Sequence, residues 1–291
     1  MLKTMRPLVL AAAFGFSASA HAADLYEPPV VDIPPMKVIE KHVAVGGWYL
    51  RGDLNYHWSR LRGTEYITYG CIGVDCGGDG ADPGTDYFDV TDLDGAMSLG
   101  AGIGYQFSRH LRTDFTADYW FKSDFRGSTS GISCEDGLPC TSTDESAYSA
   151  LLLMANAYVD LGTYHGVTPY LGAGIGGAYV SWDDLVNTTE DGTFRHEGSD
   201  GWRFAWSLMA GASYCLTENL ELDAGYRFTQ ISGGRMFEYA SGVGPGFDDG
   251  FNVHEARAGL RYSFGGSNPR CTVPQVVAYE PPAQYEPPIY K

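Results

Sequence analysis

Polar and apolar residues alternate along much of the chain, which is the pattern of β-strands, because neighbouring side chains of a strand point to opposite faces. The first clear case lies between residues 48 and 58, where even positions are apolar or small and odd positions are mostly polar. A strand with one apolar and one charged face is therefore predicted here. The apolar face holds Trp48, Leu50, Leu54, Tyr56 and Trp58, and the polar face holds Arg51, Asp53, Asn55 and His57.

The same alternation recurs in seven further segments. Each is long enough to cross a bilayer as a tilted strand, which takes about 9–11 residues. After residue 22 there is no run of about 18 apolar residues that would form a transmembrane helix. The chain is also rich in Gly (38), Tyr (20) and Phe (14), which suits β-structure with aromatic belts. The segments are 96–107, 111–122, 148–161, 168–180, 202–215, 219–231 and 253–264.

The connections between these segments alternate in length. Long polar loops at one end and tight turns at the other are typical of bacterial outer-membrane barrels. Closure of the sheet is required because an open edge in lipid would leave backbone groups unpaired. We therefore predict an all-β fold, an eight-stranded antiparallel transmembrane β-barrel over residues 46–265 with both chain ends periplasmic. The long connections are 59–94, 123–146, 181–200 and 234–251, and the short ones are 108–110, 162–166 and 216–218.

A soluble β-sandwich or lipocalin-like barrel also alternates, but it points its apolar residues inward. The charges on the polar faces favour the membrane barrel. Six basic and seven acidic residues nearly balance there, as a narrow lumen requires, since a buried charge without a partner is very costly. We predict an ion-paired lumen plug, with a gated or cation-selective pore as the alternative. The network comprises Arg51, Asp53, Arg112, Asp114, Asp118, Asp160, Arg203, Glu221, Asp223, Arg227, Glu255, Arg257 and Arg261.

The two ends of the chain differ from the barrel. Residues 1–22 have the form of a signal peptide, with a basic start, a short apolar stretch and a small-residue cleavage site. Ala23 is then the expected first residue of the mature chain. Residues 23–45 and 266–291 are Pro-rich and favour an extended polyproline II conformation. We expect both to be periplasmic tails, an N-terminal arm and a C-terminal tail.

The acidity of the chain is concentrated in the long connections. Without residues 1–22, 17 basic residues face 36 acidic ones, a net charge of −19, and the long connections hold 5 basic and 22 acidic residues. Such a chain is unsuited to nucleic acids, which bind through basic surfaces. We interpret the acidic loops as a hydrated outer surface, with binding of divalent cations at the outer leaflet as the alternative. No stretch has the spacing of an EF-hand loop, so no metal ligands are assigned.

Six cysteines in an exported chain indicate disulfide bonds. Their positions in the predicted topology suggest two bonds within long loops and one at the periplasmic end. Cross-links between the first two long loops stay open as alternatives. The suggested bonds join Cys71 to Cys76, Cys134 to Cys140, and Cys215 to Cys271.

The residues give little support for catalysis or cofactor binding. His57 and His254 lie near the outer rim of the first and last strands, but no serine is clearly paired with either and there is no G-x-S-x-G elbow. Gly172, Gly174 and Gly177 fit G-x-G-x-x-G, yet they lie in a strand pattern with no helix behind them to bind a pyrophosphate. We therefore assign no catalytic, cofactor-binding or metal-binding residues.

With these elements placed, the chain resembles the small outer-membrane β-barrel family of alphaproteobacteria, which is related to the OmpA transmembrane domain and to opacity-like proteins. The likeness extends over about residues 46–266. It rests on four moderately specific motifs: Leu111–Tyr119 (LRTDFTADY), Thr168–Gly174 (TPYLGAG), Leu220–Arg227 (LELDAGYR) and Gly259–Phe264 (GLRYSF).

The resemblance implies a structural role in envelope integrity, with outer-membrane lipids, lipopolysaccharide and the barrel-assembly machinery as partners. The assembly signal would be the last strand with Leu260, Tyr262 and Phe264, although here a tail follows Phe264. Some relatives are joined to peptidoglycan through a mature N-terminal Ala-Asp, which Ala23-Asp24 resembles. We therefore predict a non-enzymatic structural outer-membrane barrel without a cofactor. A small cation-preferring porin is the first alternative and an outer-membrane lipid-modifying enzyme the second.

Overall fold

The computed structural model describes residues 46–69, 84–132, 139–190, 192–240, 243–264, 268 and 270–271. All of them belong to one compact unit, Glu40–Gln275. The expected signal peptide, the N-terminal arm with Ala23 and most of the C-terminal tail lie outside the described residues, as do Cys71, Cys76 and Cys134. In the part described, no helix is long and apolar enough to cross a membrane.

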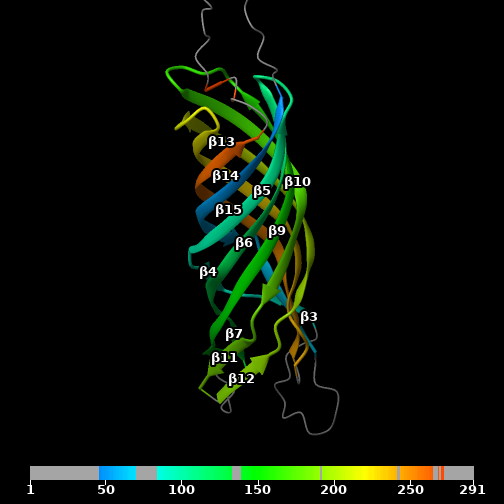
Figure 1. The fold of residues 1–291 in the computed structure, drawn as a ribbon. Helices are drawn as coiled ribbons and strands as arrows, with labels where there is room; N and C mark the ends of the chain where they lie inside the picture. Colours follow the sequence, from blue (N-terminus) through cyan, green and yellow to red (C-terminus); the bar gives the residue numbers. More distant parts are fainter. Residues whose placement is uncertain are drawn as a thin grey trace, which may run out of the picture. The chain divides into compact units, whose positions relative to one another are not determined.

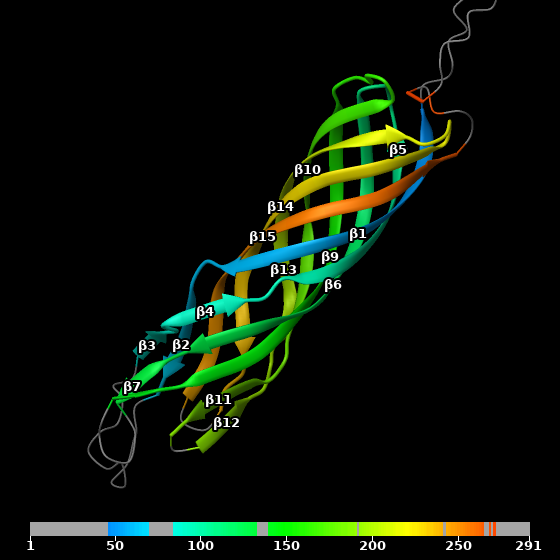
Figure 2. The same ribbon diagram turned by 90° about the vertical axis from the view of Figure 1, so that its left-hand side faces the viewer.

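Antiparallel strands close into a ring, which Figures 1 and 2 show from two sides. β1 pairs with both β5 and β15, and the pairing of β6 with β9 completes the circle. Each ring strand overlaps one segment predicted from the alternation, so the closed antiparallel barrel is confirmed. In order around the ring the strands are β1 (Gly47–Leu61), β5 (Ala96–Gln106), β6 (Leu111–Ser128), β9 (Thr143–Asp160), β10 (Val167–Trp182), β13 (Asp200–Cys215), β14 (Leu220–Phe237) and β15 (Val243–Ser263).

Short turns gather at one end of the barrel, which we call the turn end; the opposite end is the loop end. Turn side chains bond to the turn backbone. Ser108 Oγ accepts hydrogen bonds from the backbone N–H groups of His110 at 3.2 Å and Leu111 at 3.0 Å. Thr217 Oγ1 accepts two corresponding bonds at 3.3 and 3.0 Å. These bonds satisfy backbone donors inside the turn, which is why Ser and Thr favour such positions.

The ring strands extend further toward the loop end than predicted. β6 and β9 remain paired within the region 123–146, so the prediction of a loop throughout that region is wrong. The prediction ended the strand too early because the register shifts after Trp120, which leaves both Phe121 and Lys122 exposed in succession. A β-bulge of this kind breaks the strict alternation without ending the strand.

Short strands add to the barrel wall at the loop end or pair beside it (Figure 2). β2 joins β15 and β3, β4 joins β6, and β11 joins β9 and β12. β7 and β8 form a separate hairpin. These strands are β2 (Thr64–Thr68), β3 (Gly84–Tyr87), β4 (Val90–Leu93), β7 (Ser130–Ile132), β8 (Pro139–Thr141), β11 (Leu185–Thr189) and β12 (Gly192–His196).

Apolar side chains cover the outside of the ring. Leu54 is 52% exposed, whereas its neighbours Asp53 and Asn55 are 5% and 2% exposed. This is the reverse of a soluble barrel and matches an outer surface made for lipid. The band between the ends includes Leu54, Leu99, Ile103, Phe115, Leu153, Leu171, Ile175, Leu208 and Leu222. Exposed aromatic residues border it, with Trp48, Phe107, Tyr214, Tyr262 and Phe264 toward the turn end and Tyr56, Trp58, Tyr119, Phe121, Trp202 and Phe204 toward the loop end.

Candidate functional site

The barrel interior changes from charged to apolar along its length. Near the turn end Arg51 lies opposite Arg261, and toward the loop end Leu61 lies opposite Phe251. We call these two parts the ionic layer and the apolar layer. The ionic layer comprises Arg51, Asp53, Arg112, Asp114, Asp118, Asp160, Glu221, Asp223, Arg227, Glu255, Arg257, Arg261 and Arg270. The apolar layer includes Trp120, Phe125, Tyr148, Leu152, Trp182, Ile231, Phe237 and Phe251.

Arg227 joins two carboxylates in the ionic layer and is fully buried. Its guanidinium donates to Asp118 at 2.8 Å and to Glu255 at 2.7 Å. Arg257 approaches the same two carboxylates at 3.8 and 3.9 Å and lies 3.2 Å from Asp53. Each charge therefore has a partner of opposite sign, which offsets the large cost of removing it from water.

Arg51 connects this cluster to a group of hydroxyl and amide side chains. It donates to Asp114 and to the Tyr158 hydroxyl, both at 3.1 Å. Asp114 also accepts hydrogen bonds from Tyr49 at 3.1 Å and from Asn156 at 2.8 Å. Because β1, β6 and β9 supply these residues, the network ties strands from different parts of the ring together.

Arg112 combines an ion pair with aromatic contacts. It lies 3.1 Å from Asp160, and its guanidinium lies 3.9 Å from the ring centre of Tyr158 and 4.7 Å from that of Tyr170. Such cation–π contacts strengthen when they are desolvated. Gly172 makes room for Tyr158, since a Cβ at this position would lie 2.5 Å from the tyrosine ring. This inward-facing glycine thus leaves space for a large side chain of the neighbouring strand.

The described residues that follow Phe264, which are Asn268, Arg270 and Cys271, lie at the turn end of the barrel. The expected disulfide between Cys215 and Cys271 is present and links this segment to β13. Arg270 lies next to it in the chain and is held by Asp160 at 2.6 Å and by Glu221 at 3.0 Å. Arg270 therefore contributes a cation to the ionic layer at the turn end.

Arg270 was not predicted to join the network, because its position in the sequence lies in the Pro-rich C-terminal tail. The signal that could have placed Arg270 beside the barrel end is the next residue, Cys271, which was predicted to form a disulfide bond with Cys215. Burial and the nearby Arg261 lower the pKa of Arg270 to about 10, while Glu221 and Asp160 oppose this shift. Arg270 therefore stays charged at neutral pH.

Arg203 lies apart from the ionic layer, although the sequence predicted it as a member. Its guanidinium pairs with Asp248 at 2.7 Å, donates to the backbone oxygen of Arg235 at 2.7 Å, and lies 5.6 Å from the ring centre of Phe251. Asp248 was missed because it falls in a region predicted to be a loop, whereas it belongs to the long strand β15. The other twelve predicted network residues lie together in the ionic layer.

The apolar layer was not anticipated. Tyr148 and Phe251 have ring centres 5.0 Å apart, and Trp182 lies 5.5 Å from Phe237 and 5.6 Å from Phe125. Several of these residues come from regions predicted to be polar loops. The interior toward the loop end is therefore a packed hydrophobic core, whose burial of apolar surface favours the folded state.

The two histidines weighed as catalytic do not share a site. His57 is fully buried and stacks on Trp120 with ring centres 4.8 Å apart. His254 lies on the outer face, stacked on Trp58 at 5.9 Å. Ser59 Oγ lies 3.5 Å from His57 Nδ1, a longer distance than a good hydrogen bond, and 2.5 Å from the Tyr148 hydroxyl. A serine close to His57 is a contact that the sequence did not reveal.

The remaining candidates lie near the turn end. Cys215, Cys271 and Glu221 form the one cluster of potential metal ligands in the described residues, but its sulfurs are joined as a disulfide and its carboxylate is paired with arginines. The expected assembly-signal residues Leu260, Tyr262 and Phe264 are 48%, 46% and 44% exposed, as part of the lipid-facing surface.

A closed antiparallel barrel with an apolar exterior and an ion-paired interior defines the class of outer-membrane β-barrel proteins. The family model "Outer membrane protein beta-barrel domain" matches residues 8–264, and the chain belongs to this family. Its location in the outer membrane follows from this membership.

Several known proteins are similar to this chain in sequence or in structure. The chain is 38% identical over 280 residues to an uncharacterized protein of Brucella abortus, covering 85% of this chain and 93% of that one. It is 24% identical over 271 residues to the 31 kDa outer-membrane immunogenic protein of Brucella melitensis, covering 89% and 100% of the two chains. The solved structure of Neisserial surface protein A aligns with 18% identity and a TM-score of 0.44, covering 75% of this chain and 97% of that one.

Proposed function

We propose that the protein is a non-enzymatic structural barrel of the outer membrane whose lumen is closed to ions. The observation that carries the proposal is the filling of the interior by two successive layers. Arg112 and Arg227 are fully buried in the ionic layer, and Trp120 and Phe251 are fully buried in the apolar layer. A barrel of this size is just wide enough for its side chains to fill it.

The proposal includes an orientation, with the loop end outside the cell and the turn end in the periplasm. Long loops on the outside and short turns in the periplasm are the rule for bacterial barrels. The acidic loop regions then form a hydrated outer surface. The Pro-rich tails lie in the periplasm, where Ala23 would be the attachment point if the chain is joined to peptidoglycan. Together these features support a role in envelope integrity.

Planar-bilayer recording tests whether the lumen is closed. The purified mature chain is expected to give no steady current, because each ion would have to displace both layers. The variant Arg270→Ala is also expected to give no steady current, since it removes a side chain from the turn end but leaves the apolar layer in place. A steady cation-preferring current from the unaltered chain would contradict the proposal and favour the porin alternative.

A further inference from the structure

Near the loop end, β1 and β4 are neighbouring strands of the barrel wall that are not hydrogen-bonded to each other. β1 pairs with β5 only as far as His57, although it continues along β15 to Leu61. The next segment beside it, β4, pairs with β6. No pairing joins β1 to β4 in the described ranges, so the wall is open between residues 59–61 and 91–93.

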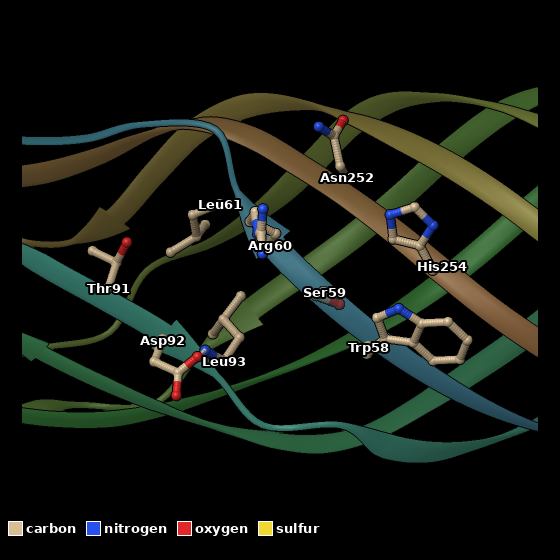
Figure 3. A pocket seen from close by; sticks show the side chains of 9 residues that line it. All are labelled: Trp58, Ser59, Arg60, Leu61, Thr91, Asp92, Leu93, Asn252 and His254. Carbon is tan, nitrogen blue, oxygen red and sulfur yellow. Dashed lines mark hydrogen bonds between the residues drawn. The ribbon is translucent and has the colours of Figure 1, made fainter.

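A cavity of about 500 Å³ fills this opening (Figure 3). Adjacent residues of a strand face opposite sides of the sheet. Even so, both Ser59 and Arg60 of β1 line the cavity, as do both Thr91 and Asp92 of β4. A cavity lined from both faces passes between the strands and does not lie on one surface. We call it the side opening.

The side opening lies at the level of the aromatic belt nearest the loop end. Trp58, which belongs to that belt, lines it together with His254, and the two rings are nearly parallel at 13°. Aromatic belts mark the interface between the acyl chains and the lipid head groups. The opening therefore faces lipid head groups, on the outer leaflet in the proposed orientation.

The lining is polar at its rim and apolar beneath. Arg60 and Asp92 are exposed, and neither makes an ion pair with another described residue. Asn252 adds an amide and Ser59 a hydroxyl. The apolar floor comes from Leu61 and Leu93.

We propose that the side opening binds the phosphorylated saccharide head group of an outer-leaflet glycolipid. A sugar ring has an apolar face of C–H groups that packs on an indole, and Trp58 offers such a face. Its hydroxyls need donors and acceptors close together, which Asp92 and Asn252 provide. Arg60 supplies a cation for the phosphate. Gln230 already donates to Asn252, and the backbone N–H of Leu93 to Asp92. A purely apolar ligand would cover the remaining donors and acceptors of these side chains without bonding to them, which costs affinity.

Native mass spectrometry of the refolded full mature chain, free of glycolipid, tests this site. The probe is an acylated glucosamine disaccharide bisphosphate added in detergent. The expected result is a retained glycolipid adduct whose affinity falls about tenfold in Trp58→Leu, the effect of losing one aromatic contact of about 1.4 kcal/mol. The matched control is Trp202→Leu, because Trp202 is an exposed belt residue outside the opening. It should bind like the unaltered chain.

Further arms identify the ligand chemistry. Asn252→Ala is a second test variant, and both variants are checked for heat-modifiable gel mobility, which reports a folded barrel. Competition by the same disaccharide without acyl chains would show that the saccharide itself is recognised. Competition only by the acylated form would show that recognition requires the membrane-linked head group. Equal binding of phosphatidylglycerol, or unchanged glycolipid binding by both variants, would overturn the proposal.

Discussion

Arg227→Met is expected to lower the free energy of unfolding by about 3–5 kcal/mol, the usual cost of breaking a buried ion pair from one side. The reason is that Asp118 and Glu255 lose their shortest ion pairs, at 2.8 and 2.7 Å. Both carboxylates are fully buried, so water cannot replace the lost guanidinium. Equilibrium unfolding in urea, followed by tryptophan fluorescence of the chain in lipid vesicles, measures the change.

An exposed pair provides the matched control. Lys122 pairs with Asp183, but their side chains are 64% and 44% exposed. Lys122→Met should therefore change the unfolding free energy by no more than about 1 kcal/mol. Adding Asp118→Asn and Glu255→Gln to the Arg227 variant should recover part of the loss, because no unpaired charge then remains buried. Equal losses in the Arg227 and Lys122 variants would contradict an ion-paired interior.

Removing the disulfide is expected to have an effect of similar size. The double variant Cys215→Ser, Cys271→Ser opens a loop with a sequence separation of 56 residues. In the chain-entropy account, a loop of this length corresponds to about 4 kcal/mol of stability. The variant also frees the segment that holds Arg270 against Asp160 and Glu221.

Urea unfolding of oxidised and reduced samples measures this contribution. The oxidised unaltered chain should unfold at a higher urea concentration than the double variant. Arg270→Ala with the disulfide intact isolates the contribution of the ion pairs, and its loss should be smaller. Coincident unfolding midpoints for the double variant and the oxidised unaltered chain would show that the disulfide does not stabilise the barrel.

The ring strands could be predicted because the alternation of polar and apolar residues indicates which side of a strand faces lipid. Leu54, for example, is exposed on the outside of the ring, whereas its charged neighbour Asp53 is buried inside it. The prediction failed where the backbone departs from strict alternation. The bulge beside Phe121 lies next to one predicted loop, and the register shift after Arg235 lies within another. In both places the strand continues past the irregularity.

Only some of the residues that fill the barrel interior could be predicted from the alternation. Charged residues within the regular strands, such as Arg51 and Asp114, could be assigned to the inner face by their position alone. The partners Asp248 and Arg270 could not, because their positions depend on contacts between distant segments. The apolar layer was hidden for the same reason, since residues such as Trp182 and Phe237 become inward-facing only when the long strands pair beyond the membrane band.

The side opening has no sequence signal. It exists because β1 remains paired with β15 as far as Leu61 but with β5 only as far as His57. Residues such as Arg60 and Asp92 therefore look like ordinary polar loop residues until the strands are placed.

The most direct test asks which side of the sheet meets lipid. Two proteins are made that retain one tryptophan each, with the other tryptophans changed to Phe. One retains the half-buried Trp206, which lies on the outer face between the inward-facing Ala205 and Ser207, and the other retains Trp120 inside the barrel. They are reconstituted in vesicles of phospholipid brominated on the acyl chains, which quenches tryptophan fluorescence on contact. The account predicts strong quenching of Trp206 and little quenching of Trp120. Quenching of Trp120 as strong as that of Trp206, or stronger, would contradict it.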